Sequence, residues 1–287
     1  MLGADYGQLL DGLRGVRWPA RRTAAGTFTG AHGSRLRGAS PEVTEWRAYR
    51  QGDDPRRLDW RLLARSERAF VRLSVDRSEL ATVIVVDASA SMAYPIPAHD
   101  KWRLARQIAV GLAAVARAAG DPVGGAVAAD RMMLAPPRAR PGAVPELAAL
   151  LDRAEPAGQG NLAAVLRSPV MHAARLVVVS DLLGEWDAVL PLLREHEATG
   201  AEAHVVHVIA DDELNPPSVA ILATDPEDAA IQRPLSVDTR AAYDSAFAEW
   251  RDGIARSLRA AGVNYVTAIT TESADRVVRR VSAGSGA

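Results

Sequence analysis

The chain is organised around one stretch of sequence, Thr82-Val83-Ile84-Val85-Val86-Asp87-Ala88-Ser89-Ala90-Ser91-Met92. Its first five residues form a β-branched apolar run, which is typical of a strand buried on both faces of a parallel sheet. The chain then turns polar, with Asp87 followed by Ser89 and Ser91 on alternate residues. Ligands of open α/β sheets bind outside the carboxyl ends of the strands. An acid and two hydroxyls there predict a hard-oxygen site suited to Mg²⁺ or Mn²⁺.

From residue 81 onward, strand and helix patterns alternate along the chain. Apolar runs predict strands at 82–87, 123–128, 175–180 and 203–209, with shorter ones at 131–134, 219–223 and 264–269. Helical periodicity predicts helices at 100–119, 144–153, 161–167, 186–198, 238–261 and 273–281. Pro136, Pro137 and Pro141 indicate a loop. This alternation predicts an α/β fold, a doubly wound and mostly parallel sheet with helices on both faces.

Residues 1–80 do not share this pattern. A helix is expected over residues 6–13, and a glycine-rich stretch follows from Gly26 to Gly38. Two domains are therefore predicted: an N-terminal, loop- and β-rich extension, 1–80, packed on a main domain, 81–287.

Residues 45–73 mix arginines and acids closely, with aromatic side chains among them. One interpretation is a salt-bridged surface whose Trp46, Tyr49 and Trp60 pack onto the core. The other is a docking face for a partner, because Arg, Trp and Tyr are enriched at binding hot spots. In the second interpretation the partner-binding candidates are Arg47, Arg50, Arg56 and Arg57.

Composition excludes several classes of function. The formal net charge of −1 argues against nucleic-acid binding, and the absence of cysteine excludes disulfides and zinc-thiolate sites. The first residues lack the pattern of a signal peptide, and no apolar run approaches the roughly 18 residues that span a bilayer. We therefore expect a cytoplasmic protein with no membrane insertion. Lys101 is the only lysine among 34 basic residues, which we interpret as codon bias.

A second acid follows a second buried strand, because Asp181 comes directly after 175–180. If the two strands are neighbours, Asp87, Ser89, Ser91 and Asp181 converge on one point and offer four oxygens to a cation. The alternative is that both acids only cap the helices that follow them, as acids at strand-to-helix turns often do.

These motifs resemble known ones. Asp87-Ala88-Ser89-Ala90-Ser91 with the distal Ser180-Asp181 resembles the metal-ion-dependent adhesion site of von Willebrand factor A domains. Tyr49-Arg50-Gln51-Gly52-Asp53-Asp54, Asp59-Trp60 and Ala64-Arg65, followed by residues 87–92, resemble the bacterial family called domain of unknown function 58. The resemblance implies a von Willebrand A-like fold and a protein that works with a MoxR-type AAA+ ATPase in chaperone-like assembly or metal insertion.

The chain departs from the family pattern in one loop. The family has Gly-Gly-Thr-Asn-Leu, whose threonine helps to coordinate the metal, whereas this chain has Gly158-Gln159-Gly160-Asn161-Leu162. Gly160 has no hydroxyl to donate, and only Gln159 or Asn161 is left to lend an amide oxygen. We therefore predict a degenerate site that binds Mg²⁺ or Mn²⁺ weakly.

The sequence contains no complete catalytic set. It has no Gly-x-Ser-x-Gly elbow of a serine hydrolase and no Gly-x-Gly-x-x-Gly after the central strand. The expected function is a non-enzymatic, protein-binding module. The alternative left open is a metal-dependent, phosphatase-like hydrolase that uses Asp87 and Asp181.

Overall fold

The computed structural model describes residues 4–21, 29–33, 45–50, 53, 58–66, 68–73, 77–184, 186–217, 221–224 and 232–284. The chain forms two compact units, one of residues 1–19 with 81–287 and the other of residues 20–80. This division differs from the sequence-based one at the first 19 residues. They join the larger unit because Tyr6, Leu13 and Trp18, in and after α1 (Ala4–Gly12), are buried in its core.

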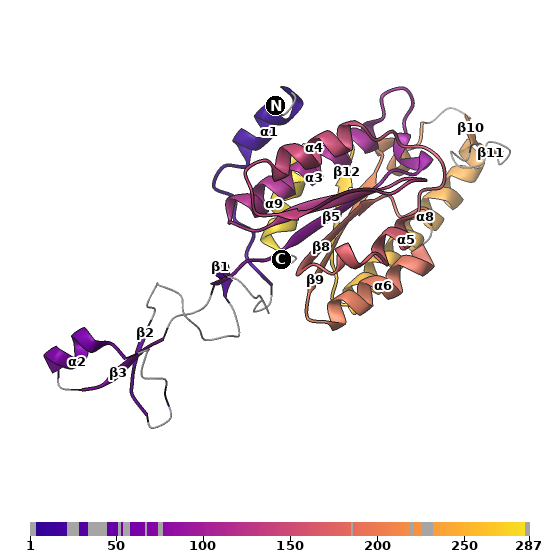
Figure 1. The fold of residues 1–287 in the computed structure, drawn as a ribbon. Helices are drawn as coiled ribbons and strands as arrows, with labels where there is room; N and C mark the ends of the chain where they lie inside the picture. Colours follow the sequence, from indigo (N-terminus) through magenta and orange to yellow (C-terminus); the bar gives the residue numbers. More distant parts are fainter. Residues whose placement is uncertain are drawn as a thin grey trace. The chain divides into compact units, whose positions relative to one another are not determined.

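The larger unit is built on a six-stranded sheet (Figure 1). Its strand order is β12-β9-β8-β5-β6-β7, and all neighbours are parallel except β6 and β7. Thr82 is in register with Val123 on one side and with Arg175 on the other. The strands are β5 (Thr82–Asp87), β6 (Val123–Ala128), β7 (Met133–Arg138), β8 (Arg175–Ser180), β9 (Glu202–Ile209) and β12 (Asn264–Ile269). The predicted mixed α/β fold with a mostly parallel sheet is thus confirmed.

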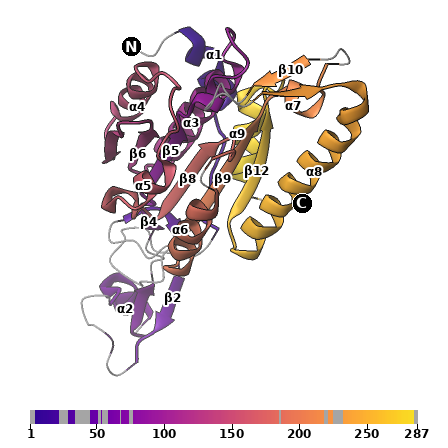
Figure 2. The same cartoon turned by 90° about the vertical axis from the view of Figure 1, so that its right-hand side faces the viewer.

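Helices cover both faces of the sheet (Figures 1 and 2). Side chains alternate along a strand, so Ile84 and Val86 join one core cluster while Val83 and Val85 join the other. The first cluster lies under α1, α3 (Asp100–Ala118), α4 (Ala143–Asp152) and α9 (Ala274–Ala283). The second lies under α5 (Leu162–Leu166), α6 (Trp186–Ala198) and α8 (Val237–Ala260).

The predicted loop at Pro136 and Pro137 is wrong, because both residues lie inside β7. β7 is the last strand of the sheet, and an edge strand tolerates a residue that cannot donate to a neighbour. The short strand predicted at 219–223 is β10 (Ile221–Thr224). It pairs with β11 (Gln232–Leu235) outside the main sheet.

The sheet has its switch point at β5 and β8. α3 follows β5 toward one face, whereas α6 follows β8 toward the other. The chain therefore diverges at the carboxyl ends of these two strands, where ligands of open α/β sheets bind. Short elements complete this edge: η2 (Ala90–Ala93) and α7 (Asp211–Leu214). η3 (Pro169–Met171) precedes β8.

A buried cation holds the opposite, amino edge of the sheet. The Arg175 guanidinium lies 3.2 Å from Glu202 Oε2, 3.8 Å from Asp121 Oδ2 and 4.0 Å from the ring centroid of Trp18. It also donates to the carbonyl oxygens of Trp18 and Pro19. One side chain therefore ties the N-terminal segment to the sheet.

In its described residues, the smaller unit consists of short strands and a helix. β2 (Glu45–Ala48) pairs with β3 (Phe70–Leu73), and β1 (Thr29–Gly33) with β4 (Arg77–Ser78). Asp59 accepts hydrogen bonds from two backbone amides of α2 (Trp60–Ser66) and from Trp46 Nε1. Trp46 and Trp60 are nevertheless 51% and 61% exposed. Neither indole ring is therefore buried within the smaller unit itself. In the described part of the chain, no helix has the length and apolarity to cross a membrane.

Candidate functional site at the carboxyl edge

Asp87 is the last residue of β5 and lies at the centre of the site. Its Oδ1 accepts a hydrogen bond from the Ser89 amide at 2.9 Å, and its Oδ2 accepts one from the Ser180 hydroxyl at 2.6 Å. The carboxyl group is buried, and this burial, together with the charge of Asp181, raises its pKa to about 6. The fold therefore keeps a titratable acid at a position that disfavours its charged form.

The two serines of the loop after β5 lie beside this acid. Ser89 and Ser91 are buried, and their hydroxyl oxygens are 3.0 Å apart. Asp87, Ser89 and Ser91 therefore form one compact group of oxygens carried by a single loop.

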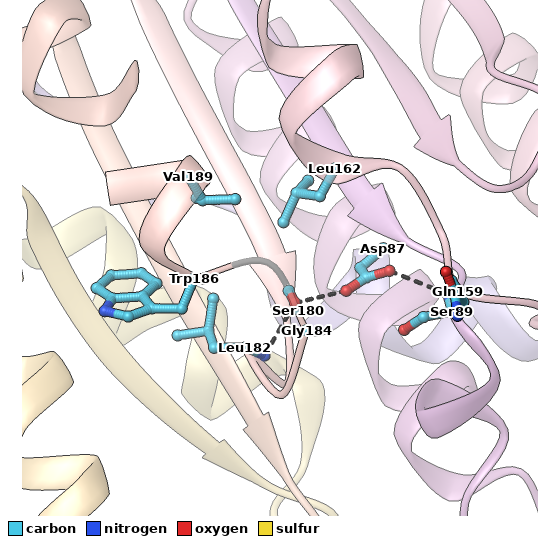
Figure 3. A pocket seen from close by; sticks show the side chains of 9 residues that line it. All are labelled: Asp87, Ser89, Gln159, Leu162, Ser180, Leu182, Gly184, Trp186 and Val189. Carbon is cyan, nitrogen blue, oxygen red and sulfur yellow. Dashed lines mark hydrogen bonds between the residues drawn. The ribbon is translucent and has the colours of Figure 1, made fainter. Parts of the chain in front are cut away.

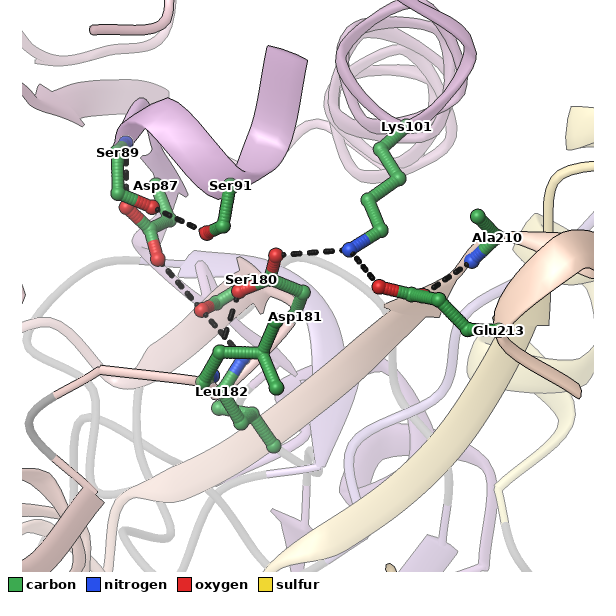
Figure 4. A network of polar contacts seen from close by, with 10 residues as sticks. Asp87, Ser89, Ser91, Lys101, Ser180, Asp181, Leu182, Ala210 and Glu213 are labelled. Atoms are coloured by element: carbon green, nitrogen blue, oxygen red, sulfur yellow. Dashed lines mark hydrogen bonds and ion pairs between the residues drawn. The ribbon is translucent and has the colours of Figure 1, made fainter. Parts of the chain in front are cut away.

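Asp181 is held differently from Asp87 (Figure 4). Its Oδ2 accepts a hydrogen bond from Lys101 Nζ at 3.0 Å, and Lys101 Nζ lies 2.5 Å from Glu213 Oε1. Burial alone would lower the pKa of the Lys101 ammonium, but Asp181 and Glu213 hold it above its ordinary value. The second predicted acid thus belongs to a buried ion network that joins β8, α3 and α7.

A second loop, residues 157–161, closes over the first. The Ala90 amide donates to the Gly158 carbonyl, and the Ala157 amide donates to the Ala88 carbonyl. Gly160 has φ of +66°, a left-handed conformation that favours glycine. Asn161 Oδ1 accepts from the Ala164 amide and caps α5, so this oxygen already has a donor. The Gln159 side chain is exposed and lines the pocket described next.

A small pocket opens beside Asp87 (Figure 3). Asp87, Ser89 and Ser180 form its polar end. The remaining lining is largely apolar and comes from the second loop and from the segment after β8: Gln159, Leu162, Leu182, Gly184, Trp186 and Val189. The site therefore has a polar centre with an apolar wall.

The predicted cation ligands fit a metal only in part. Asp87, Ser89 and Ser91 lie together and offer oxygens of the kind that Mg²⁺ or Mn²⁺ prefers. Asp181 instead pairs with an ammonium, and Gly160 contributes no side-chain oxygen. Among the described residues, no three His, Cys, Asp or Glu side chains are grouped to hold a metal ion. Asp181 is therefore held by Lys101 while Asp87, Ser89 and Ser91 lie together, and a joint metal-ligand role of the four residues stays a prediction.

The close approach of Gly160 to Asp87 can be tested. A Cβ at residue 160 would lie 3.1 Å from Asp87 Oδ1 and 3.2 Å from Ser89 Cβ. We expect Gly160→Ala to lower the free energy of unfolding by about 2–3 kcal/mol, from backbone strain plus crowding. Gly15→Ala is the matched control, because Gly15 has φ of +79° with nothing within 4 Å of its Cβ position. Urea denaturation measures both variants, and equal losses in free energy of unfolding would contradict the close approach of residue 160 to Asp87.

The predicted partner-binding arginines lie in the smaller unit. Arg47 forms an ion pair with Asp53 at 2.8 Å, and the Arg50 amide donates to Asp53. The Arg50 side chain is exposed. Arg56 and Arg57 lie outside the described residues.

Three residues of the site were not among its predicted members: Lys101, Ser180 and Glu213. Lys101 has a signal in the sequence, because it is the single lysine of an arginine-rich chain, but composition alone favours codon bias as the interpretation. Ser180 was noted only as the neighbour of Asp181. Nothing in the sequence near Glu213 points to the site, because α7 reaches Lys101 only through the fold.

The fold and site define an α/β protein with a polar centre at the switch point of its sheet. Residues 45–253 match the family described as "Protein of unknown function DUF58", and the chain belongs to this family. "Uncharacterized protein Mb1516" of Mycobacterium bovis is 29% identical over 268 residues, covering 90% of this chain and 84% of that protein.

Two solved structures are similar at low identity. BatB from Bacteroides thetaiotaomicron has a TM-score of 0.42 at 14% identity, over 69% of this chain and 94% of that one. An aerotolerance-related membrane protein from Bacteroides fragilis has a TM-score of 0.43 at 14% identity, over 70% and 95%. Both likenesses are too distant to carry an argument about the site.

Proposed function

We propose that this protein is a non-enzymatic binding module whose carboxyl-edge site docks a partner protein. The partner, suggested by the family resemblance, is a MoxR-type AAA+ ATPase. The site corresponds to a degenerate form of the metal-ion-dependent adhesion site of a von Willebrand A-like domain. The place of action expected from the sequence is the cytoplasm.

The observation that carries this proposal is the position of exposed apolar side chains. In the described part of the larger unit, the exposed large apolar residues are Tyr94, Ile96, Met132 and Leu183. Their exposure runs from 37% for Tyr94 to 76% for Ile96. All four lie on loops that follow the carboxyl ends of β5, β6 and β8. We call these four residues the apolar rim. Large apolar side chains exposed together at one edge of a protein are a feature of interaction surfaces.

The smaller unit offers a second apolar surface. Trp46 and Trp60 are both more than half exposed, and tryptophan is enriched at interface hot spots. Arg50 lies close to them in sequence, with an exposed side chain. This supports the docking interpretation of residues 45–73 over an internal packing role.

The hydrolase alternative has less support. Both oxygens of Asp87 accept hydrogen bonds, and Asp181 is paired with Lys101. The two acids therefore do not present a free carboxylate pair for two-metal or acid–base chemistry. A phosphatase assay with added Mg²⁺ or Mn²⁺ tests this alternative. Hydrolysis that is lost in Asp87→Ala would favour it.

Removal of the rim tests the binding proposal. We expect the double variant Ile96→Ser with Leu183→Ser to weaken binding of the purified MoxR-type ATPase by at least about tenfold, since buried apolar anchors dominate interface affinity. The control is Arg140→Ser with Glu146→Ser, which removes an exposed ion pair away from the rim. The variant Arg50→Ala measures how much the smaller unit contributes to the affinity for the ATPase. Wild-type affinity in the rim variant would contradict a docking role of the rim.

A further inference from the structure

The single lysine of the chain is buried in the candidate site. Lys101 lies in the first turn of α3 and has no exposed surface. Its ammonium contacts Asp181 at 3.0 Å and Glu213 at 2.5 Å, and it lies 5.7 Å from the ring centroid of Tyr94. The other 33 basic residues, from a total of 34, are arginines. The question is why this buried position has a lysine when every other basic residue is an arginine.

The reason lies in the shape of the cation. An ammonium is a compact point charge with three donors, whereas a guanidinium is a planar fork that needs more room. Lys101 meets acceptors from two elements, β8 and α7, at short distances inside the protein. A compact ammonium reaches both acceptors from one point.

The ammonium neutralises acids that would otherwise repel one another. Asp87, Asp181 and Glu213 bring three carboxyl groups to this edge, and Lys101 is the cation that contacts two of them. Glu213 is fixed on its other side, where its Oε2 accepts from the Ala210 amide at 2.7 Å. The Tyr243 hydroxyl donates to the Glu213 carbonyl at 3.0 Å. The network thus ties the segment after β8 to α3, α7 and α8.

We propose that Lys101 is a tethered cation that takes the place of a divalent ion on Asp181. The ammonium withholds Asp181 from a metal and holds the loops of the carboxyl edge together. A divalent ion at Asp87, Ser89 and Ser91 is then left with ligands from one loop and is repelled by the neighbouring ammonium. This inference goes beyond the partner-binding proposal and does not depend on the partner.

Release of Asp181 by mutation tests this inference. The double variant Lys101→Met with Glu213→Gln removes the ammonium and one acid, so the net charge of the network is unchanged while Asp181 loses its ammonium partner. We expect its dissociation constant for Mn²⁺, measured by electron paramagnetic resonance on the full chain, to be at least about tenfold lower than that of the wild type.

The matched control is Lys101→Met with Asp181→Asn. It has the same net charge but lacks the Asp181 carboxylate, so its Mn²⁺ affinity is expected to remain at or below the wild-type value. The proposal is overturned if the first double variant binds Mn²⁺ no more tightly than the wild type, or if both double variants gain affinity equally.

A measurement on the wild type covers the case in which the first variant does not fold. Because Lys101 is the only lysine, protein labelled with ¹⁵Nζ-lysine has one side-chain ammonium resonance. We expect this resonance to be protected from solvent exchange near neutral pH and to keep its position as Mg²⁺ is added. A rapidly exchanging signal, or a saturable shift on adding Mg²⁺, would overturn the proposal. Neither result requires the ATPase, so failure here is distinct from failure of the partner-binding proposal.

Discussion

Replacing Arg175 by methionine is expected to lower the free energy of unfolding by about 3–5 kcal/mol, as for other buried ion pairs that lose one partner. The guanidinium is fully buried between Glu202 and Asp121 and stacks on Trp18. Methionine fills part of the volume but removes the guanidinium that contacts both acids. It also leaves the Trp18 and Pro19 carbonyl oxygens without their donor. Loosening of residues 4–19 is therefore expected along with the loss of stability.

The control for this variant is Arg140→Met. Arg140 pairs with Glu146 at 2.6 Å, but both side chains are exposed, and exposed pairs contribute only about 0–1 kcal/mol. Chemical denaturation of the two variants measures the difference. A loss below about 1 kcal/mol for Arg175→Met would show that the acids find other partners and that the network is not a clamp.

Asp87→Asn is expected to stabilise the protein near neutral pH by about 1–3 kcal/mol. Raising the pKa of Asp87 from 3.8 to about 6 corresponds to an unfavourable free energy of about 3 kcal/mol for the ionised form, as an upper limit. Asparagine removes the charge and keeps both contacts. Its oxygen accepts from the Ser89 amide, and its amide group donates to the Ser180 hydroxyl.

The pH dependence of this gain has a definite sign. Below about pH 3.8, Asp87 is protonated in both the folded and unfolded states, and the variant has no advantage. As pH rises to about 6, the folded wild type retains its proton longer than the unfolded chain. The stability of the wild type therefore falls relative to that of the variant. Above about pH 6 the difference in free energy of unfolding between the variant and the wild type is constant.

The difference between the two proteins is the quantity to measure. Burial lowers the pKa of His207 to about 4, so each protein loses stability from this histidine as pH falls. That contribution is the same in both and cancels. Urea denaturation across the pH range, with a chelator present, gives the difference. A variant less stable than the wild type near neutral pH would show that the Asp87 charge is compensated by the fold.

A stabilising mutation at Asp87 would indicate selection for something other than stability. Functional groups are often retained where they disfavour the folded state. An acid whose charged form is unfavourable, beside two hydroxyls and within an apolar rim, is such a group. The same substitution in a merely structural residue would lower stability.

The fold was largely predictable because its signal is local. Val83, Val85 and their neighbours form an apolar run that only a doubly covered strand accounts for, and β5, β6, β8 and β12 lie where the sequence places them. Pro136 and Pro137 indicate a loop when read locally, because their compatibility with β7 depends on its edge position, which is a property of the whole sheet. The membership of α1 in the larger unit likewise depends on contacts with distant residues.

The site was predictable only where one loop carries it. Asp87, Ser89 and Ser91 are adjacent in the chain, so their spacing brings them together. The Asp181–Lys101–Glu213 network joins residues 80 and 112 positions apart, and no local pattern encodes it. Lys101 also shows that a residue rare in a chain can mark a site. Composition alone favours codon bias as the interpretation of this lysine.

We propose that a partner protein binds at the carboxyl edge of the sheet. Hydrogen–deuterium exchange of the full chain, with and without the purified MoxR-type ATPase, tests it most directly. Binding at this edge is expected to slow exchange in residues 88–99, 129–132 and 181–184, the loops that carry the site and the apolar rim. Binding that leaves these three loops unchanged, or no binding at saturating ATPase, would contradict it.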